Sequence, residues 1–334
     1  MTAVRAFAPG RVNLIGDHTD HTGGLALPFA LELGTTVDGE RGGDTVVLRS
    51  DDLPGTAVVP LDVADPASVE PGWARYVAGV VAELRPARGL VGTVSTTLPI
   101  GAGLSSIAAL ELAVALALGF EGSALDLALL CQRAERRASG VPCGLMDQLT
   151  SASGLAGHAL LLDCTASTAR PVPLPDDLEV VVVHSGEARS LATSAYADRR
   201  AACEAADALI GPLRDADLAD VATIADPVVR RRARHVVTEN QRVLAASRAI
   251  AAGDGPALGA LLTASHASLA TDLEVSTPAL DLLVGRLAAT PGVHGARLTG
   301  AGFGGCAVAV GERGCLTGTG WHVRPGHGAA LVGH

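Results

Sequence analysis

Four stretches of this sequence carry residue types that could do chemistry. One of them, residues 98–111, reads L-P-I-G-A-G-L-S-S-I-A-A-L-E. Gly101 and Gly103 allow a tight turn there, and Ser105 and Ser106 can cap the helix that follows. The N-terminus of a helix attracts anions, so this loop could cradle a phosphate group. An ordinary strand–turn–helix connection is the alternative.

A second stretch, residues 8–28, is dense in polar side chains and turn-forming glycines. Within it lie Arg11, Asp17, His18, Asp20 and His21. This density, between two apolar runs, predicts a loop whose side chains converge on a polar ligand. Because an ionised carboxylate accepts hydrogen bonds from several hydroxyl groups, a sugar would suit this loop. A metal site built from the H-T-D-H run is the alternative.

The other two stretches offer one acid and one glycine-rich loop. Residues 143–154 read C-G-L-M-D-Q-L-T-S-A-S-G, where Asp147 is the only acidic residue. Such an acid could be a catalytic base, a helix cap or the partner of an arginine. Residues 297–310, R-L-T-G-A-G-F-G-G-C-A-V-A-V, place glycines between two β-prone segments, which allows the backbone to approach a ligand closely. A glycine hairpin with a purely structural role is also open.

Composition limits the chemistry further. All 25 basic residues are arginine, so the chain lacks the lysine of a P-loop, of a protein-kinase strand or of a Schiff base. The net charge of -10 argues against a nucleic-acid-binding surface, and we interpret the arginines at 230–234 as a solvated or lobe-contacting helix face rather than a phosphate-binding patch. The N-terminus shows no apolar leader, and the apolar helix expected at 107–118 is too short to span a bilayer. We therefore expect a soluble, cytoplasmic protein with no nucleic-acid or membrane partner.

The elements that must position these stretches can be read from periodicity and capping signals. A chain of 334 residues is long enough for two domains or lobes. Ser123 and Asp126 resemble a capping box that opens a helix through Ser139, which Gly140 stops. Other helices are expected at 73–84, 107–118, about 190–211, 227–252, 256–270 and 276–289, and strands at 45–49, 56–61, 90–97, 159–162 and 178–184.

Taken together, these motifs resemble the GHMP small-molecule kinase superfamily and, within it, the galactokinases. G-R-V-N-L-I-G-D-H-T-D, P-I-G-A-G-L-S-S, C-G-L-M-D-Q and L-T-G-A-G-F-G-G-C occur in the expected order, and R-A-R-H-V-V-T-E-N and V-S-T-P-A-L-D also fit. The resemblance implies a two-lobe α+β and α/β fold with the active site in the cleft between the lobes. An α/β lobe, 1–175, would carry a phosphate-binding loop at 99–107. An α+β lobe, 176–334, would carry a glycine-rich loop at 299–306 that closes over the nucleotide.

The resemblance also implies a sugar 1-kinase that uses ATP and Mg²⁺, with galactose as the default substrate. Asp147 would take the proton from the anomeric hydroxyl group or stabilise it as an alkoxide, and Arg11 would keep Asp147 ionised. The residues implied in sugar binding are Asp17 and His18 near C6, Asp20 and Gly144 at the ring hydroxyls, and Tyr196. Those implied in binding the ATP phosphates are Gly101, Ala102, Gly103, Leu104, Ser105 and Ser106, with Glu135 and Ser106 for the metal ion.

Some positions depart from the family's usual pattern. The family usually has Glu where this chain has Asp17, and often Tyr where it has His21. One methylene fewer withdraws the carboxylate by roughly 1.5 Å, which would make room near C6 unless the change is neutral drift. Ile107 stands where the family has a serine that binds Mg²⁺, so a water or a neighbouring serine would have to replace that ligand. Arg189 lies one residue away from the position of a basic residue in the family.

Two alternatives therefore accompany the galactose kinase. Asp17 and His21 would suit a kinase for a modified or C6-extended aldose, of seven or eight carbons, in a specialised biosynthesis. Ile107 would suit a non-catalytic sensor that binds sugar and ATP, whereas the retained Arg11 and Asp147 favour a kinase. The expected partner is a small-molecule sugar, and the expected assembly is a monomer or a weak homodimer.

Overall fold

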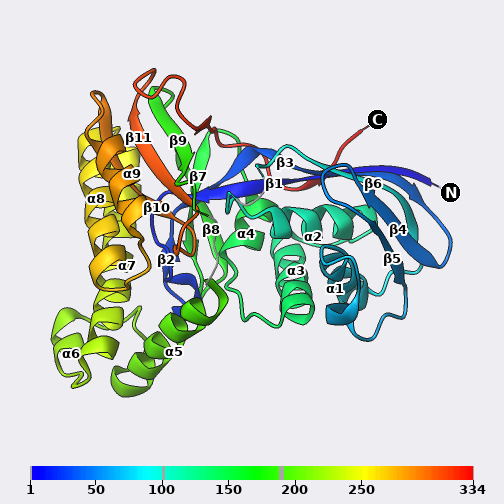
Figure 1. The fold of residues 1–334 in the computed structure, drawn as a ribbon, viewed down its shortest axis with the longest axis horizontal. Coiled ribbons are helices and arrows are strands. Elements are labelled where there is room, and N and C mark those ends of the chain that lie inside the picture. The colour runs from blue at the N-terminus through cyan, green and yellow to red at the C-terminus, as the bar shows by residue number, and fades with distance from the viewer. Residues whose placement is uncertain (1, 100–101, 188–191, 334) are drawn as a thin grey trace.

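The first sheet of the computed structural model is built on one long antiparallel pair (Figure 1). The structure describes residues 2–99, 102–187 and 192–333. Strands β1 (Thr2–Asn13) and β3 (Pro28–Arg41) pair along their length, with a register shift just before Arg11. Alternate residues of the first half of β1 are buried, as expected for a strand with one face on a core. The order of the sheet is β13-β1-β3-β6-β4-β5, with β13 (Ala330–Leu331), β6 (Leu90–Thr96), β4 (Thr45–Ser50) and β5 (Thr56–Pro60).

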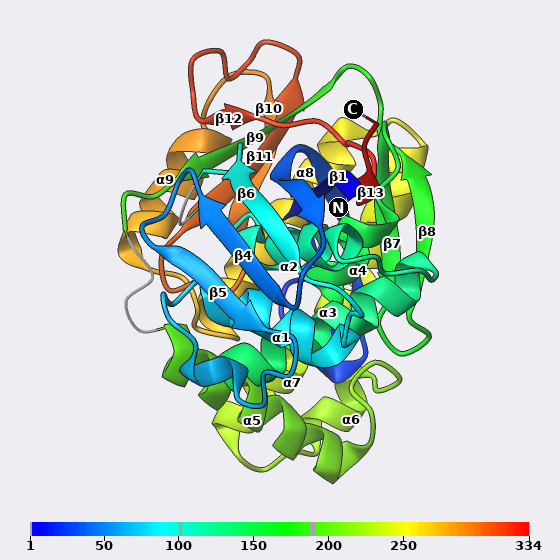
Figure 2. The same ribbon diagram turned by 90° about the vertical axis from the view of Figure 1, so that its right-hand side faces the viewer.

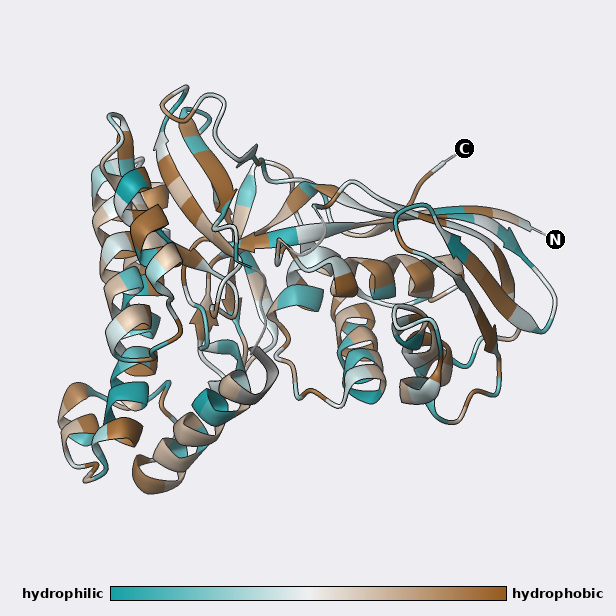
Figure 3. Cartoon of the chain, in the orientation of Figure 1, coloured by the Kyte–Doolittle hydropathy of each residue, from teal (hydrophilic) through white to brown (hydrophobic). Residues whose placement is uncertain are grey.

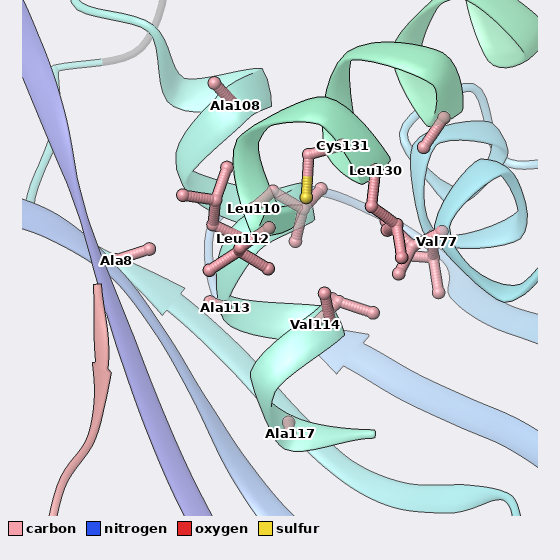
Figure 4. Close-up of a cluster of buried hydrophobic side chains, with 14 of the residues drawn as sticks. Ala8, Val77, Ala108, Leu110, Leu112, Ala113, Val114, Ala117, Leu130 and Cys131 are labelled. Carbon is pink, nitrogen blue, oxygen red and sulfur yellow. The ribbon is translucent and has the colours of Figure 1, made fainter. Parts of the chain in front are cut away.

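Helices lie on one side of this sheet (Figure 1). They are α1 (Ala74–Leu84), α2 (Ser106–Ala117), α3 (Ala124–Ser139) and α4 (Met146–Ser153), of which α3 packs mainly on the other helices. The central one, α2, packs on β1 and β3 and is apolar on nearly every side, which is typical of a buried helix. Figure 4 shows its Leu110, Leu112 and Val114 among Val77 of α1 and Leu130 of α3. The start of α2 is therefore held rigidly at the end of the first glycine loop.

A second sheet and a group of long helices form the other half of the molecule. The sheet has the order β10-β11-β9-β12, made of β10 (Val293–Thr299), β11 (Cys306–Glu312), β9 (Leu178–His184) and β12 (Trp321–His322). The helices are α5 (Ala192–Ile210), α6 (Leu218–Ala222), α7 (Pro227–Ala251), α8 (Gly255–Thr271) and α9 (Pro278–Ala288). Helices α8 and α9 pack on β10, while α5 and α6 extend away from the sheet (Figure 1).

A small third sheet and the C-terminal segment join the two halves. The sheet has the order β2-β7-β8, with β2 (Leu25–Ala26), β7 (His158–Asp163) and β8 (Thr168–Pro173). The C-terminal segment returns to the first sheet, where β13 pairs with β1 (Figure 2). The backbone N–H of Val332 donates to the carbonyl of Arg5 at 2.8 Å, which anchors this return.

Most of the predicted elements are confirmed. Helix α3 begins at a capping box between Ser123 and Asp126 and ends at Gly140 in a left-handed conformation, as the sequence predicts. Figure 3 shows apolar residues concentrated on α2 and on the strands of the two large sheets. The short helix α6 and the long strands β1 and β3 were not predicted. Within the described residues, no helix is long and apolar enough to cross a membrane.

Candidate active site

One cavity, of about 370 Å³, brings together side chains from all four stretches of the sequence analysis. The side chains come from the end of β1, the loop after it, the starts of α2 and α4, and the glycine-rich loop after β10. The residues that line it are Arg11, Asp17, His18, Asp20, Ile107, Glu135, Val141, Cys143, Gly144, Met146, Asp147, Gln148, Tyr196, Gly300 and Ala301. The implied catalytic pair and all the implied sugar-binding residues thus share one cavity.

Asp147 lies in the first turn of α4, where the helix dipole favours a negative charge. Arg11 Nη2 lies 2.7 Å from its Oδ1, and Ser105 Oγ donates to its Oδ2 at 2.6 Å. The Asp147 side chain is 36% exposed whereas that of Arg11 is only 9% exposed. The carboxylate is therefore fixed at both oxygens and still open to the cavity. In this position it can accept a proton from a bound hydroxyl group.

Arg11 also ties the first glycine loop to Asp147. Its Nη1 donates to the carbonyl of Gly103 at 2.9 Å, and its backbone N–H donates to the carbonyl of Leu104 at 3.1 Å. The prediction of a loop at Arg11 was wrong, because the pairing of β1 with β3 resumes after the register shift and continues to Asn13. A side chain on a strand is more rigidly placed than one on a loop, so the correction strengthens the catalytic interpretation.

The first glycine loop turns into α2 at Ser105, whose backbone φ of 62° is left-handed. Its side chain does not cap the helix, so the predicted cap was wrong. A capping residue ordinarily has an extended backbone, which Ser105 does not have, and its hydroxyl group donates to the carboxylate of Asp147. Ser106 is exposed at the first position of α2, where free N–H groups face the loop. The rest of the implied phosphate-binding loop comprises Ala102 and Leu104, which are buried, Gly103, and Gly101, which lies outside the described residues.

Asp20 lies directly against the backbone of Gly144, on the side of the cavity formed by the loop before α4. A Cβ atom on residue 144 would lie 1.6 Å from Asp20 Oδ2, so this approach requires glycine. Burial and the negative charge of Asp147 raise the pKa of Asp20 to about 6. Near pH 7, Asp20 is therefore a half-buried carboxylate that can accept hydrogen bonds from hydroxyl groups.

Three rings form a cluster at this cavity. The ring centroids of His18 and Tyr196 lie 5.4 Å apart, and His21 lies edge-on to both, at 6.1 Å from His18 and 6.0 Å from Tyr196. His18 Nε2 donates to the carbonyl of Ala301 at 3.1 Å. Burial lowers the pKa of His18 and lowers that of His21 to about 4, so both rings are neutral near pH 7. His21 thus supports the wall formed by His18 and Tyr196. The basic residue that the sequence analysis considered beside Tyr196, Arg189, lies outside the described residues.

The carboxylate of Asp17 is held by three donors of the protein itself. Its Oδ1 accepts the backbone N–H of Gly300 at 2.8 Å, and its Oδ2 accepts Asn13 Nδ2 at 2.9 Å and the guanidinium of Arg297. Asp17 and Arg297 are 4% and 0% exposed at their side chains. Although Asp17 lines the cavity, its carboxylate therefore anchors the glycine-rich loop of the second half to the loop after β1.

Helix α7 supplies further anchors that the sequence analysis did not assign a role. His235 Nε2 donates to the carbonyl of Asp17 at 3.1 Å, and the buried Glu239 accepts the backbone N–H of Gly16 at 3.0 Å. Asn240 Oδ1 accepts the N–H of Leu25 at 2.8 Å. The sequence did indicate a shared role, because in the run R-A-R-H-V-V-T-E-N the residues at positions 235 and 239 lie on one face of a helix.

Glu135 and Ser106, the implied metal ligands, do not line the same cavity. Glu135 lines the cavity of Asp147, and burial and the charge of Asp147 raise its pKa to about 7. Ser106 lines a neighbouring cavity of about 280 Å³, whose lining includes Trp73, Tyr76 and Leu110. Ile107 lines both cavities and so forms part of the wall between them.

The arginines at 230–234 form ion pairs and hydrogen bonds with other residues of the protein. Arg231 and Arg232 pair with Glu274 at 3.1 and 2.5 Å, and Arg234 pairs with Asp272. Arg230 Nη1 donates to the carbonyl of Ile224 at 3.2 Å. These partners all lie in the second half of the chain, and Arg231 and Arg234 remain partly exposed, so the run forms a partly solvated helix face and not a contact between the lobes.

Comparisons with known proteins agree along the chain. Three family models match it: the galactokinase galactose-binding signature at residues 2–40, the GHMP kinases N terminal domain at 75–155 and the GHMP kinases C terminal model at 246–314. Galactokinase of Homo sapiens is 43% identical over 323 residues, which cover 91% of this chain and 82% of the relative. Galactokinase of Roseiflexus sp. is 44% identical over 328 residues, which cover 92% and 83%.

The fold agrees with a solved structure of similar sequence. The crystal structure of Lactococcus lactis galactokinase complexed with galactose superposes with a TM-score of 0.90 at 31% identity, covering 99% of this chain and 95% of that one. With relatives above 40% identity over nine-tenths of its length, the chain belongs to the galactokinase family of the GHMP kinases and is a phosphotransferase.

Proposed function

We propose that this protein transfers the γ-phosphoryl group of ATP to the anomeric hydroxyl group of galactose or a closely related aldose. The observation that carries the proposal is the carboxylate of Asp147, which Arg11 and Ser105 hold between the sugar-type cavity and the first glycine loop. Asp147 would accept the proton as the hydroxyl oxygen attacks phosphorus, and ADP would leave in line with that attack. Positioning and charge supply the rest of the catalysis, so no lysine is needed.

The cavity supports a sugar as the acceptor. Asp20 and the backbone of Gly144 would hold ring hydroxyl groups, while His18 and Tyr196 would line the remainder of the ring. Asp17 contributes from the C6 side, where three protein donors already hold its carboxylate. The lining comes from both predicted lobes, which supports a division near residue 175 with the site in the cleft between them.

The nucleotide would extend from the first glycine loop into the neighbouring cavity. That cavity is mostly apolar, and Trp73 and Tyr76 offer aromatic faces for a base. Ser106 and the first N–H groups of α2 lie at its edge, where they can meet phosphate oxygens. We expect the enzyme to act in the cytoplasm on small molecules, as a monomer or a weak homodimer.

Electrostatics supports a divalent cation, Mg²⁺ in this family, beside Glu135. The main cavity is lined by the carboxylates of Asp20, Glu135 and Asp147 and by the positive charge of Arg11. The fourth carboxylate, that of Asp17, is already neutralised by Arg297. ATP would add several negative charges to this cavity. The raised pKa of Glu135 fits a carboxylate that a cation would stabilise, although Ile107 offers no oxygen ligand. When bound, the ion would offset the charge that develops on the phosphoryl oxygens.

The proposal is tested by ATP consumption across a panel of aldoses. Galactose should be turned over rapidly, while 1-deoxygalactose, which lacks the accepting hydroxyl group, should bind without turnover. Asp147→Asn should lower kcat by about 10²- to 10⁴-fold and leave sugar binding by calorimetry intact. A wild-type rate in Asp147→Asn would refute the assigned base, and sugar binding without turnover of any aldose would favour the sensor.

A kinase for a C6-extended aldose is the second candidate. It is favoured by one observation: the short side chain of Asp17 is drawn towards Arg297 and Gly300. This arrangement would leave space for a substituent at C6. A higher kcat/KM for a seven-carbon analogue than for galactose would select this candidate, and the reverse ranking would reject it.

A further inference from the structure

Glu111 is a fully buried acid in the middle of the apolar helix α2. Its side chain is 0% exposed, and neither of its carboxylate oxygens accepts a hydrogen bond from the described residues. The residues before and after it in the sequence, Leu110 and Leu112, belong to the hydrophobic cluster that Figure 4 shows. An ionised carboxylate without hydrogen bonds is very costly in such a place, so the position needs a physical reason.

The surroundings of Glu111 point towards the active site. Glu111 lies one turn after Ile107, which lines the active-site cavity, and α2 packs against both α3 and α4. The charges that act on Glu111 are those of Glu135 and Asp147, and Gln148 lies within hydrogen-bonding reach. Glu111 therefore stands directly behind the acids of the site.

Three orphaned acceptor atoms meet in this cluster. Gln148 Nε2 donates to Glu135 Oε2 at 2.5 Å, but the buried Gln148 Oε1 receives no donor from the described residues. Both oxygens of Glu111 are also without a donor. A carboxylate and an amide oxygen cannot bond to each other, whereas a carboxylic acid donates one hydrogen bond. Burial and the two neighbouring carboxylates raise the pKa of Glu111 well above its usual value and outweigh the opposite effect of Gln148, so the net shift agrees with a neutral acid.

We propose that Glu111 is a positioning residue that donates a hydrogen bond, as a neutral acid, to Oε1 of Gln148. Gln148 in turn holds Glu135, and it directly follows Asp147 in the first turn of α4. One hydrogen-bonded chain therefore runs from the core of α2 through α4 to α3. This inference rests on the proposed kinase function, because its effect is on the alignment of Asp147 and Glu135.

The size of the effect follows from geometry. Without the hydrogen bond from Glu111, the Gln148 amide can rotate and release Glu135, and the first turn of α4 loses a restraint. A displacement of about 1 Å at a catalytic group costs roughly 10²-fold in rate. The binding of the sugar by Asp20 and Gly144, on another side of the cavity, should be little changed.

Two substitutions distinguish a role of Glu111 in positioning Gln148 from a role that only fills space in the core. Glu111→Gln replaces the acid by an amide of the same shape whose NH₂ group can donate to Gln148. Glu111→Met keeps the length but removes the donor. An apolar group in place of a buried acid is often neutral or stabilising, so a loss of rate with no loss of stability points to positioning.

The test measures kcat, both KM values and the melting temperature. We expect Glu111→Gln to keep kcat close to wild type, and Glu111→Met to lower kcat about 10- to 100-fold with an unchanged KM for the sugar and an equal or higher melting temperature. In a Gln148→Leu background, Glu111→Met should cause no further loss. Wild-type kcat in Glu111→Met, equal losses in both variants, or loss of folding in Glu111→Met would each overturn the proposal.

An infrared measurement keeps this inference distinct from the proposed function. The carbonyl band of protonated carboxyl groups should be weaker at pH 7 in Glu111→Gln than in the wild type, whether or not any aldose is phosphorylated, while Glu135, with a pKa of about 7, contributes equally to both. A band of equal intensity in the two proteins would overturn the neutral acid. Failure of the wild-type enzyme to phosphorylate any aldose would instead refute the proposed function.

Discussion

The ion pair between Asp17 and Arg297 allows the sharpest prediction for the anchoring of the site. Both side chains are almost fully buried, and among the described residues Asp17 keeps Asn13 and Gly300 as donors when the guanidinium is removed. Removing one partner of a buried pair leaves an uncompensated charge, which costs about 3–5 kcal/mol. We therefore expect Arg297→Met to lower the free energy of unfolding by about this amount, and Asp17→Asn to have a similar effect. Because each single change already breaks the pair, the double variant should cost less than the sum by about 2 kcal/mol or more.

Urea unfolding measures these energies. The chain has two tryptophans, Trp73 on the first half and Trp321 on the second, so a Trp73→Phe background reports on the half that contains Arg297. Agreement of fluorescence with circular dichroism establishes whether one transition is observed. The control is Arg5→Met, since Arg5 lies 3.7 Å from Asp38 and both side chains are about half exposed. An exposed pair of this kind is worth about 0–1 kcal/mol. A loss below about 1 kcal/mol in Arg297→Met, or additive losses in the double variant, would refute the reasoning.

Three further predictions concern the ligands. Gly144→Ala should raise the Kd of the sugar at least about tenfold by calorimetry, because the new Cβ would displace Asp20. The control Gly285→Ala, which has open space around it, should leave the Kd unchanged. Equal effects of the two changes would contradict this prediction. The pKa of Asp20 is raised to about 6, so it loses its charge as the pH falls through 6, and the Kd of the sugar should rise there but stay flat in Asp20→Asn. Ile107→Ser should lower the Mg²⁺ concentration for half-maximal activity, since it adds an oxygen ligand, and Ile107→Val should leave it unchanged; an unchanged value in both would argue against a metal ion at this position.

Local signals in the sequence were sufficient for most elements of the fold. The capping box at Ser123, the left-handed glycine at Gly140 and the valine-rich run of β9 each depend on a few neighbouring residues. The strand before the first glycine loop and the apolar helix after it were also predicted, with ends that differ by one residue. Such features can be read without knowing the tertiary structure, because their energetics is local.

The failures have one physical cause, which is competition from partners distant in sequence. Arg11 was expected in a loop because polar residues and glycines surround it, but pairing with β3 keeps it on a strand. Ser105 was expected to cap α2, but its backbone is left-handed and its hydroxyl group donates to the distant Asp147. Neither partner can be identified from the local sequence. The two errors lie at the active site, where function overrides local preference.

The sequence also predicted which residues share the cavity, but not how they are used. Asp17 was assigned to sugar binding by resemblance. Its buried partner Arg297 was noted only as the first residue of a glycine-rich motif and was given no role. The roles of His235 and Glu239 depend on α7 packing against the loop after β1. Contacts of this kind join residues more than 200 positions apart. A pattern in one sequence does not encode them.

One short segment, residues 11–18, anchors both glycine-rich loops. At its start, Arg11 binds the carbonyls of Gly103 and Leu104, and at its end Asp17 and His18 bind the backbone of residues 300 and 301. Under the proposed function, the phosphate donor and the sugar would therefore be positioned against the same piece of chain, which would fix the distance between the reacting atoms. A substitution that moves this segment should impair sugar and nucleotide binding together. A change at Gly144, which lies outside the segment, should impair sugar binding alone, so the comparison of the two distinguishes a shared anchor from two independent sites.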